Sequence, residues 1–177
     1  VFKRSLYNQI DWNQKLIEIR GSRGVGKTTL MLQKAKEYFT NNSESVLYIS
    51  LDDSYFYSNS IKEVALEFSQ YGGKYLFIDE VHKYPEKYLG HDWSAELKNI
   101  YDQIPELKVV YSGSSIIQLH KGNGDLSRRK SSFVMSGLSF REYLGINNTL
   151  SLQIYTLEEI IDNHVDIANN IISEIKI

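Results

Sequence analysis

The residues best suited to chemistry stand in two short stretches of the chain. The first stretch combines three glycines with a lysine and two threonines, in the sequence G-S-R-G-V-G-K-T-T from Gly21 to Thr29. The second places two carboxylates, Asp79 and Glu80, directly after the apolar run Y-L-F-I. Glycine-rich backbone beside a lysine suits the binding of phosphate groups, and neighbouring carboxylates suit a cation or an activated water.

The first stretch follows the pattern G-x-x-x-x-G-K-[ST] over residues 21–28. The apolar-rich run L-I-E-I-R at 16–20 precedes it, and a helical pattern follows from Thr29 to Tyr38. Strand, glycine loop and helix form the context that a phosphate-binding P-loop requires. Glycines let the backbone curl around a phosphate, and a helix opening at Lys27 adds unpaired N–H groups and the positive end of its dipole.

Each side chain of this P-loop has a predicted role. We expect Lys27 to reach the β- and γ-phosphates, the Thr28 hydroxyl to ligate Mg2+, and Thr29 to donate to the α-phosphate. The predicted nucleotide site contains Gly21, Ser22, Arg23, Gly24, Val25, Gly26, Lys27, Thr28 and Thr29. The alternative is a plain glycine turn, but a chance match to the whole pattern is rare at ordinary glycine usage.

The second stretch is interpreted as a Walker B motif, because an apolar strand delivers Asp and then Glu downstream of a P-loop. Asp79 is expected to hold Mg2+ directly or through a water, and Glu80 to polarise the attacking water. This acid pair favours hydrolysis over transfer to a second substrate. His82 follows immediately, and either orients the active site or forms local hydrogen bonds.

A third candidate group follows the apolar run Leu107–Tyr111, where the chain reads S-G-S-S. ATPases of the additional-strand type place a sensor at the tip of the strand beside Walker B. We therefore expect Ser112 or Ser114 to hydrogen-bond the γ-phosphate or the lytic water. Ser114 and Ser115 are equally suited to cap the helix that follows.

Two charged groups have open interpretations. Arg128 and Arg129, with Lys130, are suited to stabilise a phosphoryl transition state in cis or from a neighbouring subunit. The alternative is a solvated basic turn, or ion pairs that hold a loop. Asp52 and Asp53 end the second predicted strand, 46–51, and either face the nucleotide crevice or cap the next helix.

Composition limits the remaining function classes. A chain of 177 residues is one domain, or one domain with the start of another. The net charge of −2 gives no general attraction to nucleic acid or to an anionic membrane. The absence of cysteine excludes disulfides and thiolate metal sites and agrees with a cytoplasmic location. No apolar run is long enough to span a membrane.

The C-terminal part differs from the rest. After Gly145 the chain turns polar, and a capping box, Thr156 with Glu159, then opens a long helix with apolar positions. The apolar face of such a helix must pack against another part of the protein or a partner. We therefore divide the chain into a domain over residues 1–146 and a helical extension over 147–177, which starts or links to a further C-terminal domain.

Several blocks in one order carry a family resemblance: G-S-R-G-V-G-K-T-T-L, Y-L-F-I-D-E-V-H-K-Y-P, L-K-V-V-Y-S-G-S-S, G-D-L-S-R-R and G-L-S-F-R-E-Y-L. Over residues 1–146 the chain resembles the prokaryotic AAA-like ATPase domain of the STAND-related group. The resemblance implies a three-layer α/β/α P-loop fold of the additional-strand type. It implies a mostly parallel five-stranded sheet of order near 5-1-4-3-2, ATP with Mg2+, and often a C-terminal domain of unknown function.

The function expected is Mg2+-dependent ATP binding and hydrolysis, acting as a regulatory switch. The alternative is a nucleotide-gated protein-interaction module with little hydrolysis of its own. Expected partners are ATP and ADP and an unidentified protein or C-terminal domain, and a homo-oligomer is compatible with the sequence. Nucleic-acid binding has only residues 128–130 in its favour, and the chain lacks the N-K-x-D motif that reads guanine.

Overall fold

The computed structural model describes residues 2–41, 45–85, 92–113, 126–146 and 153–174. The chain forms two compact units. One unit is continuous, from Leu6 to Gly137, and the other joins Val1–Ser5 to Leu138–Ile177. The predicted boundary at residue 146 remains a prediction.

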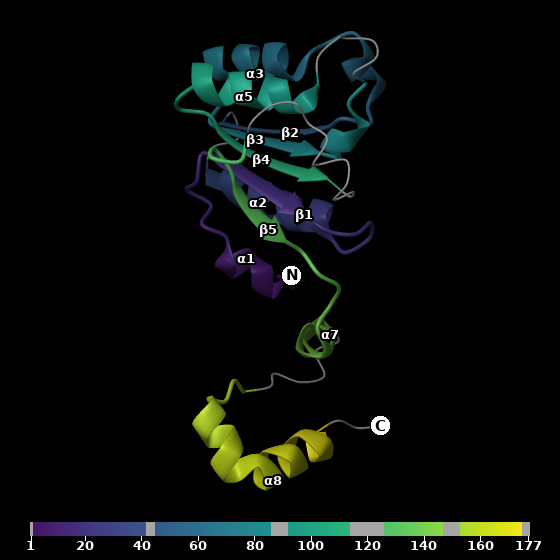
Figure 1. The fold of residues 1–177 in the computed structure, drawn as a ribbon, viewed down its shortest axis with the longest axis vertical. Helices are drawn as coiled ribbons and strands as arrows, with labels where there is room; N and C mark the ends of the chain where they lie inside the picture. Colours follow the sequence, from purple (N-terminus) through teal and green to yellow (C-terminus); the bar gives the residue numbers. More distant parts are fainter. Residues whose placement is uncertain (1, 42–44, 86–91, 114–125, 147–152, 175–177) are drawn as a thin grey trace. The chain divides into compact units, whose positions relative to one another are not determined.

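The continuous unit contains one parallel sheet of five strands (Figure 1). The strands are β1 (Leu16–Arg20), β2 (Val46–Ser50), β3 (Tyr75–Asp79), β4 (Lys108–Gly113) and β5 (Ser131–Val134). Their order is β2-β3-β4-β1-β5, and every neighbouring pair is parallel. This is the predicted order read from the other edge of the sheet, so the expected fold is confirmed.

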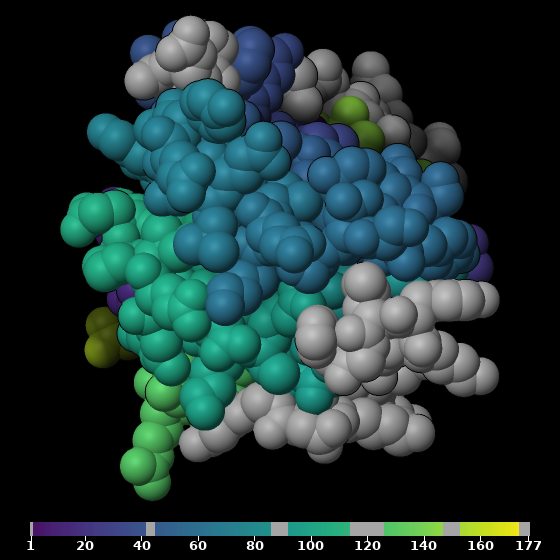
Figure 2. All heavy atoms as spheres, turned by 90° about the horizontal axis from the view of Figure 1, so that it is seen from above, coloured from purple at the N-terminus to yellow at the C-terminus, as the bar shows by residue number. Residues whose placement is uncertain are grey.

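Helices cover both faces of the sheet. α3 (Ile61–Gln70) and α5 (Trp93–Gln103) cover one face, and Figure 2 shows their blue and green-teal segments side by side. α2 (Lys27–Asn41) covers the opposite face, together with residues of α1 (Ser5–Gln9). Two short 3₁₀ turns follow strands: η2 (Ser54–Tyr57) after β2 and η3 (Val81–Lys83) after β3.

Strand residues alternate between two hydrophobic cores, as the period of two in a strand requires. In β1, Leu16 packs on the side of α3 and α5, whereas Ile17 and Ile19 pack on the side of α2. In β3, Leu76 and Ile78 pack on the same side as Leu16, under α3 and α5. The alternation places the next odd-numbered residue of β3, Asp79, on the side of α2 and of the P-loop.

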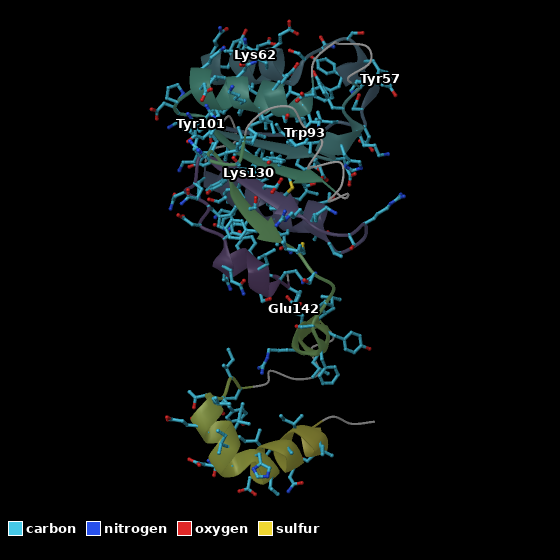
Figure 3. All side chains as sticks on the ribbon, in the orientation of Figure 1. Tyr57, Lys62, Trp93, Tyr101, Lys130 and Glu142 are labelled. Atoms are coloured by element: carbon cyan, nitrogen blue, oxygen red, sulfur yellow. The ribbon has the colours of Figure 1, made fainter. Side chains whose placement is uncertain are left out.

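One strand residue breaks the apolar pattern. Glu18, only 1% exposed, lies in β1 and accepts hydrogen bonds from Tyr111 (3.1 Å), Lys130 (2.7 Å) and Ser132 (2.5 Å). Burial alone would raise the pKa of Glu18, but these hydrogen bonds and the charge of Lys130 lower it. Lys130, labelled in Figure 3, therefore joins β5 to β1 through a buried ion pair.

Loss of this ion pair should be costly, because it leaves a buried carboxylate without its counter-charge. We expect Lys130→Met to lower the free energy of unfolding by about 2 kcal/mol, a value reduced for the partial exposure of the lysine. The measurement is urea unfolding followed by the fluorescence of Trp12 and Trp93, both in the continuous unit. The control is Lys36→Met at an exposed position of α2. Equal midpoints for the two variants would contradict the expectation.

In the second unit, Glu142 holds residues of the N-terminal segment to the G-L-S-F-R-E block. One carboxylate oxygen accepts from Arg4 Nε (3.0 Å), Ser5 N (2.9 Å) and Ser5 Oγ (2.8 Å). The other accepts from Ser139 N (3.0 Å), while Ser139 Oγ accepts from Glu142 N (3.2 Å). Ser139 and Glu142 thus cap α7 (Phe140–Ile146).

The predicted capping box of the C-terminal helix is confirmed. Thr156 and Glu159 exchange hydrogen bonds at the start of α8 (Leu157–Glu174), which is kinked at Asn163. Most of its large apolar side chains are exposed, with Ile160 at 43% and Ile172 at 67%, whereas Ile167 and Ile171 are partly buried. None of the described helices is long and apolar enough to cross a membrane.

The Glu142 cluster, formed by Glu142 with Arg4, Ser5 and Ser139, leads to a prediction about pH. Burial alone would raise the pKa of Glu142, but the hydrogen bonds from Arg4, Ser139 and Ser5 outweigh it and lower the pKa to about 2. A carboxyl whose pKa is lower in the folded state stabilises the fold at pH values above its unfolded pKa of about 4.3. This contribution is lost as the pH falls towards 2.

We therefore expect the side-chain carboxyl ¹³C signal of Glu142 (labelled in Figure 3) to show an ionised group at pH 3.5. The same signal should titrate at higher pH in Arg4→Ala, because a donor to the carboxylate is removed. Titration of the unchanged protein near 4.3 would show that the cluster does not form.

Candidate functional site

Residues 21–26 connect β1 to α2, as the sequence predicts. Gly24 and Gly26 have φ angles of 82° and 100°, which side-chain-bearing residues rarely adopt. Gly21 is required for another reason: an added Cβ would lie 2.3 Å from the carbonyl oxygen of Met135. Met135 N donates to Arg20 O at 2.7 Å, so the chain leaving β5 passes directly against the P-loop.

Lys27 begins α2 and is only 5% exposed. Its Nζ donates to the carbonyl oxygens of Gly21 and Ser22, both at 3.0 Å, which holds the ammonium group within the curve of the loop. Burial lowers the pKa of Lys27, and the negative charges of Glu80 and Asp79 oppose this shift. The Lys27 ammonium group thus lies buried against the glycine backbone, and its contact with phosphate stays a prediction.

Asp79 is the point where the elements of the site meet. Its Oδ2 accepts from Thr28 Oγ1 (2.5 Å) and from Tyr48 OH (2.8 Å). Its Oδ1 accepts from Ser112 Oγ and from Glu80 N (3.0 Å). Burial raises the pKa of Asp79, but the hydrogen bonds from Ser112, Thr28 and Tyr48 outweigh it, so the net shift is downward. The carboxylate is therefore ionised at neutral pH.

Thr28 and Asp79 supply the oxygen ligands that Mg2+ prefers, at the mouth of a P-loop. Among the residues that the structure describes, no group of three or more His, Cys, Asp or Glu side chains could hold a metal ion. This combination fits Mg2+, because Mg2+ usually takes one or two protein ligands and completes its shell with waters and substrate phosphates.

Sequence reasoning missed Tyr48. It lies in β2 and reaches Asp79 from the neighbouring strand, where Ser50 pairs with Asp79. Burial and the hydrogen bond to Asp79 raise the pKa of the Tyr48 phenol, which therefore stays protonated and donates. An aromatic residue within a strand is ordinarily part of the core. Its only sequence signal is its position two residues before the end of a strand that ends in polar side chains.

A cavity of about 370 Å³ opens beside the P-loop. It is lined by Arg23, Thr28, Tyr48, Ser50, Asp52, Asp79, Glu80, His82 and Lys83. Asp52 therefore faces the crevice, whereas Asp53 accepts from Tyr55 N at 2.8 Å and caps η2. Each of the two interpretations of this acid pair applies to one of its members.

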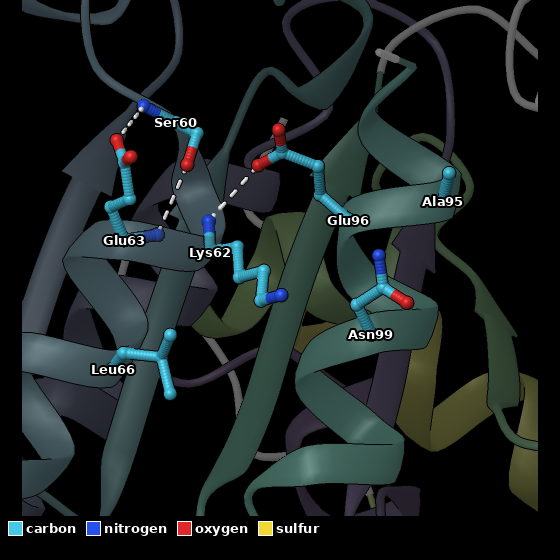
Figure 4. A pocket seen from close by; sticks show the side chains of 7 residues that line it. All are labelled: Ser60, Lys62, Glu63, Leu66, Ala95, Glu96 and Asn99. Atoms are coloured by element: carbon cyan, nitrogen blue, oxygen red, sulfur yellow. Dashed lines mark hydrogen bonds between the residues drawn. The ribbon is translucent and has the colours of Figure 1, made fainter.

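A second cavity, of about 450 Å³, lies between α3 and α5 (Figure 4). Its charged groups serve the packing of the helices: Ser60 and Glu63 cap α3, and Glu96 accepts from Lys62 N at 3.0 Å and from Tyr84 OH at 2.8 Å. None of the predicted site residues lines this cavity, so the chemistry belongs to the smaller one.

Glu80 borders the smaller cavity with its carboxylate beside a histidine. His82 Nε2 lies 3.2 Å from Glu80 Oε2. Burial lowers the pKa of His82, and the charge of Glu80 opposes this shift. The sequence suggested either an orienting or a merely local role for His82, and the structure brings it to the predicted water-activating carboxylate.

The predicted sensor and arginine residues have different outcomes. Ser112 is fully buried and reaches the site through Asp79. Ser114 lies outside the described residues. Arg129 binds Asp102 at 3.0 Å, and Arg128 is exposed in the same turn. This turn precedes β5, whereas the P-loop follows β1. Because β1 and β5 are parallel, the turn lies at the amino ends of the strands and the P-loop at their carboxyl ends.

The turn thus lies at the amino ends of the strands, away from the P-loop, and a role for Arg128 or Arg129 in cis has no support in this geometry. The ion-pair interpretation is correct for Arg129. A role in a neighbouring subunit stays a prediction. Of the arginines the structure describes, Arg23 is the one that lines the cavity.

Comparison with known families matches residues 13–144 to the family model described as "AAA domain". This chain belongs to that family. A curated relative, Uncharacterized protein MJ1637 of Methanocaldococcus jannaschii, is 29% identical over 171 residues, which cover 94% of this chain and 35% of the relative. The chain thus spans about a third of the length of that relative.

Solved structures support the fold of this AAA domain. It is similar to the S. cerevisiae Hsp104–ADP complex, with a TM-score of 0.54, 20% identity, and coverage of 82% of this chain and 23% of that one. It is also similar to AMPPCP-bound DnaA from Aquifex aeolicus, with a TM-score of 0.51, 20% identity, and coverage of 93% and 56%.

The close approach at Gly21 makes a prediction for the AAA domain. Gly21→Ala should lower the free energy of unfolding by about 1–3 kcal/mol, because the methyl group must displace either the P-loop or the chain at Met135. The matched control is Gly137→Ala, where an added Cβ meets no atom within 4 Å. Chemical denaturation compares the two, and an unchanged midpoint for Gly21→Ala would show that the loop does not pack as described.

Proposed function

We propose that this AAA domain binds ATP with Mg2+ and hydrolyses it to ADP and phosphate. The observation that carries the proposal is the arrangement around Asp79. It bonds Thr28 of the P-loop helix at 2.5 Å, beside a buried Lys27, and its neighbour Glu80 borders the same cavity. A phosphate-binding loop, a site for a cation and a carboxylate for water are thus within one small volume.

Each group has a defined task in this reaction. The P-loop amides and Lys27 bind the phosphates, and Thr28 and Asp79 hold Mg2+, which neutralises phosphate charge when bound. Glu80 accepts a proton from the attacking water while the oxygen of that water forms a bond to the γ-phosphorus. The bond from that phosphorus to the bridging oxygen breaks, and its electron pair leaves with ADP. Ser112 and Tyr48 keep the Asp79 carboxylate in place.

We further propose that hydrolysis serves a regulatory switch of the STAND-related kind, located in the cytoplasm. The exposed apolar side chains of α8 support a role for residues 147–177 as the link to a further domain or protein partner. A homo-oligomer would allow Arg128 of one subunit to reach the site of another. These assignments rest on the resemblance of the sequence blocks and on this exposure.

A nucleotide-gated interaction module with little hydrolysis is the second candidate. The engagement of Arg129 with Asp102, away from the P-loop, favours it, because this arginine is not available in cis to stabilise the transition state. Turnover by the isolated chain decides between the two candidates.

The test measures Mg2+-dependent ATP binding by calorimetry and phosphate release under saturating ATP. Lys27→Ala should weaken binding about tenfold or more, because charge-assisted hydrogen bonds to the phosphates are lost. Glu80→Gln should bind ATP normally and lose about a hundredfold or more in kcat, the usual contribution of a general base. Lys36→Ala, exposed on α2, is the control and should change neither value.

Three outcomes are informative. The pattern above supports hydrolysis with these roles. Mg2+-dependent binding without turnover would replace hydrolysis by the gated module. No nucleotide binding by the unchanged protein would refute both candidates.

A further inference from the structure

The chain turns sharply at the end of β3, and this turn brings Glu80 and His82 together. Among the described residues, Glu80 is the non-glycine residue with a positive φ, at 55°. Such a left-handed conformation is unfavourable for a residue with a side chain and persists where the surroundings enforce it. The chain then folds into η3, with Lys83 N donating to Glu80 O at 2.8 Å. The result is the 3.2 Å contact of His82 Nε2 with Glu80 Oε2.

Both flanks of His82 are anchored in the core under α3 and α5. Val81 is fully buried, and the buried Tyr84 donates through its hydroxyl to Glu96 at 2.8 Å. The His82 side chain is 8% exposed, whereas that of Glu80 is 25% exposed. The imidazole therefore has little freedom to move, and the carboxylate is the more accessible member of the pair.

Burial also selects the state of the ring. It lowers the pKa of His82, so the imidazole is neutral at pH 7 and carries one N–H. With Nε2 3.2 Å from Glu80 Oε2, the favoured tautomer carries that proton on Nε2 and donates it to this carboxylate oxygen. A fixed donor of this kind restricts a carboxylate that could otherwise rotate about its side-chain bonds.

We propose that His82 is a positioning residue for ATP hydrolysis: its Nε2 holds one oxygen of the Glu80 carboxylate and thereby directs the carboxylate to the attacking water. The inference rests on the proposed function, because it assigns to Glu80 the role of accepting the proton. The pair follows the general logic of a base oriented by a neighbouring side chain.

The test compares kcat and the dissociation constant of ATP for His82→Ala and His82→Gln. We expect His82→Ala to lower kcat about ten- to a hundredfold with unchanged ATP binding. His82→Gln should recover part of the loss, because its amide N–H reaches about as far as Nε2. His164→Ala, in the exposed α8, is the matched histidine control and should behave as the unchanged protein.

A double variant tests whether His82 acts through Glu80. In the Glu80→Gln background, His82→Ala should cause no further loss of turnover, because residues that act as a unit are not additive. A full additional loss would show that His82 acts independently. An unchanged or increased kcat for His82→Ala alone would also overturn the proposal, an increase showing that the contact restrains Glu80 instead.

Nitrogen NMR of the imidazole ring supplies a readout that needs no turnover. We expect the nucleotide-free protein to show His82 with its proton on Nε2 at pH 7, and the Nε2 signal to shift in Glu80→Gln. A proton on Nδ1, or no shift in the variant, would refute the contact itself. If the contact is present but the unchanged protein binds ATP without turnover, the proposed hydrolysis has failed, and the positioning role fails with it.

Discussion

The hydrogen bonds accepted by Asp79 are the constraint on which the rest of the site depends. Four donors reach this one carboxylate: the hydroxyls of Thr28, Tyr48 and Ser112, and the amide of Glu80. They come from the P-loop helix, from the strands on both sides of β3, and from the turn after it. A shift of any one of these elements leaves a buried donor or a buried charge unsatisfied, which is costly. The carboxylate therefore fixes the register of three strands beside the P-loop.

A second buried carboxylate has a comparable effect on the other face of the sheet. Glu18 ties β1 to β4 through Tyr111 and to β5 through Lys130 and Ser132. The P-loop strand is thus held on both sides by groups that tolerate little displacement. This rigidity serves the loop that follows, since a P-loop binds phosphate only when its amides already point in the right directions.

Much of this arrangement could be predicted from the sequence because it depends on local patterns. The glycine spacing before Lys27, the apolar run before Asp79 and the Thr156–Glu159 cap each have a short signature, and each lies where its signature indicates. The contact of Tyr48 with Asp79 could not be predicted, because it depends on the pairing of β2 with β3. The choice between the two interpretations of Arg129 could not be made for the same reason: its charge is evident from the sequence, but only the direction of β5 shows at which end of the strands it lies.

The strand order also has a consequence for synthesis on the ribosome. β1 emerges early, yet its two neighbours in the sheet are the last two strands that the structure describes, with Ile19 beside Ser112 on one side and Phe133 on the other. The early pair β2 and β3 can associate while β1 still lacks partners. Closing such long loops is slow compared with local pairing. The P-loop strand therefore cannot be paired on both sides until β5 has left the exit tunnel, and a nascent chain should not capture nucleotide before the domain is nearly complete.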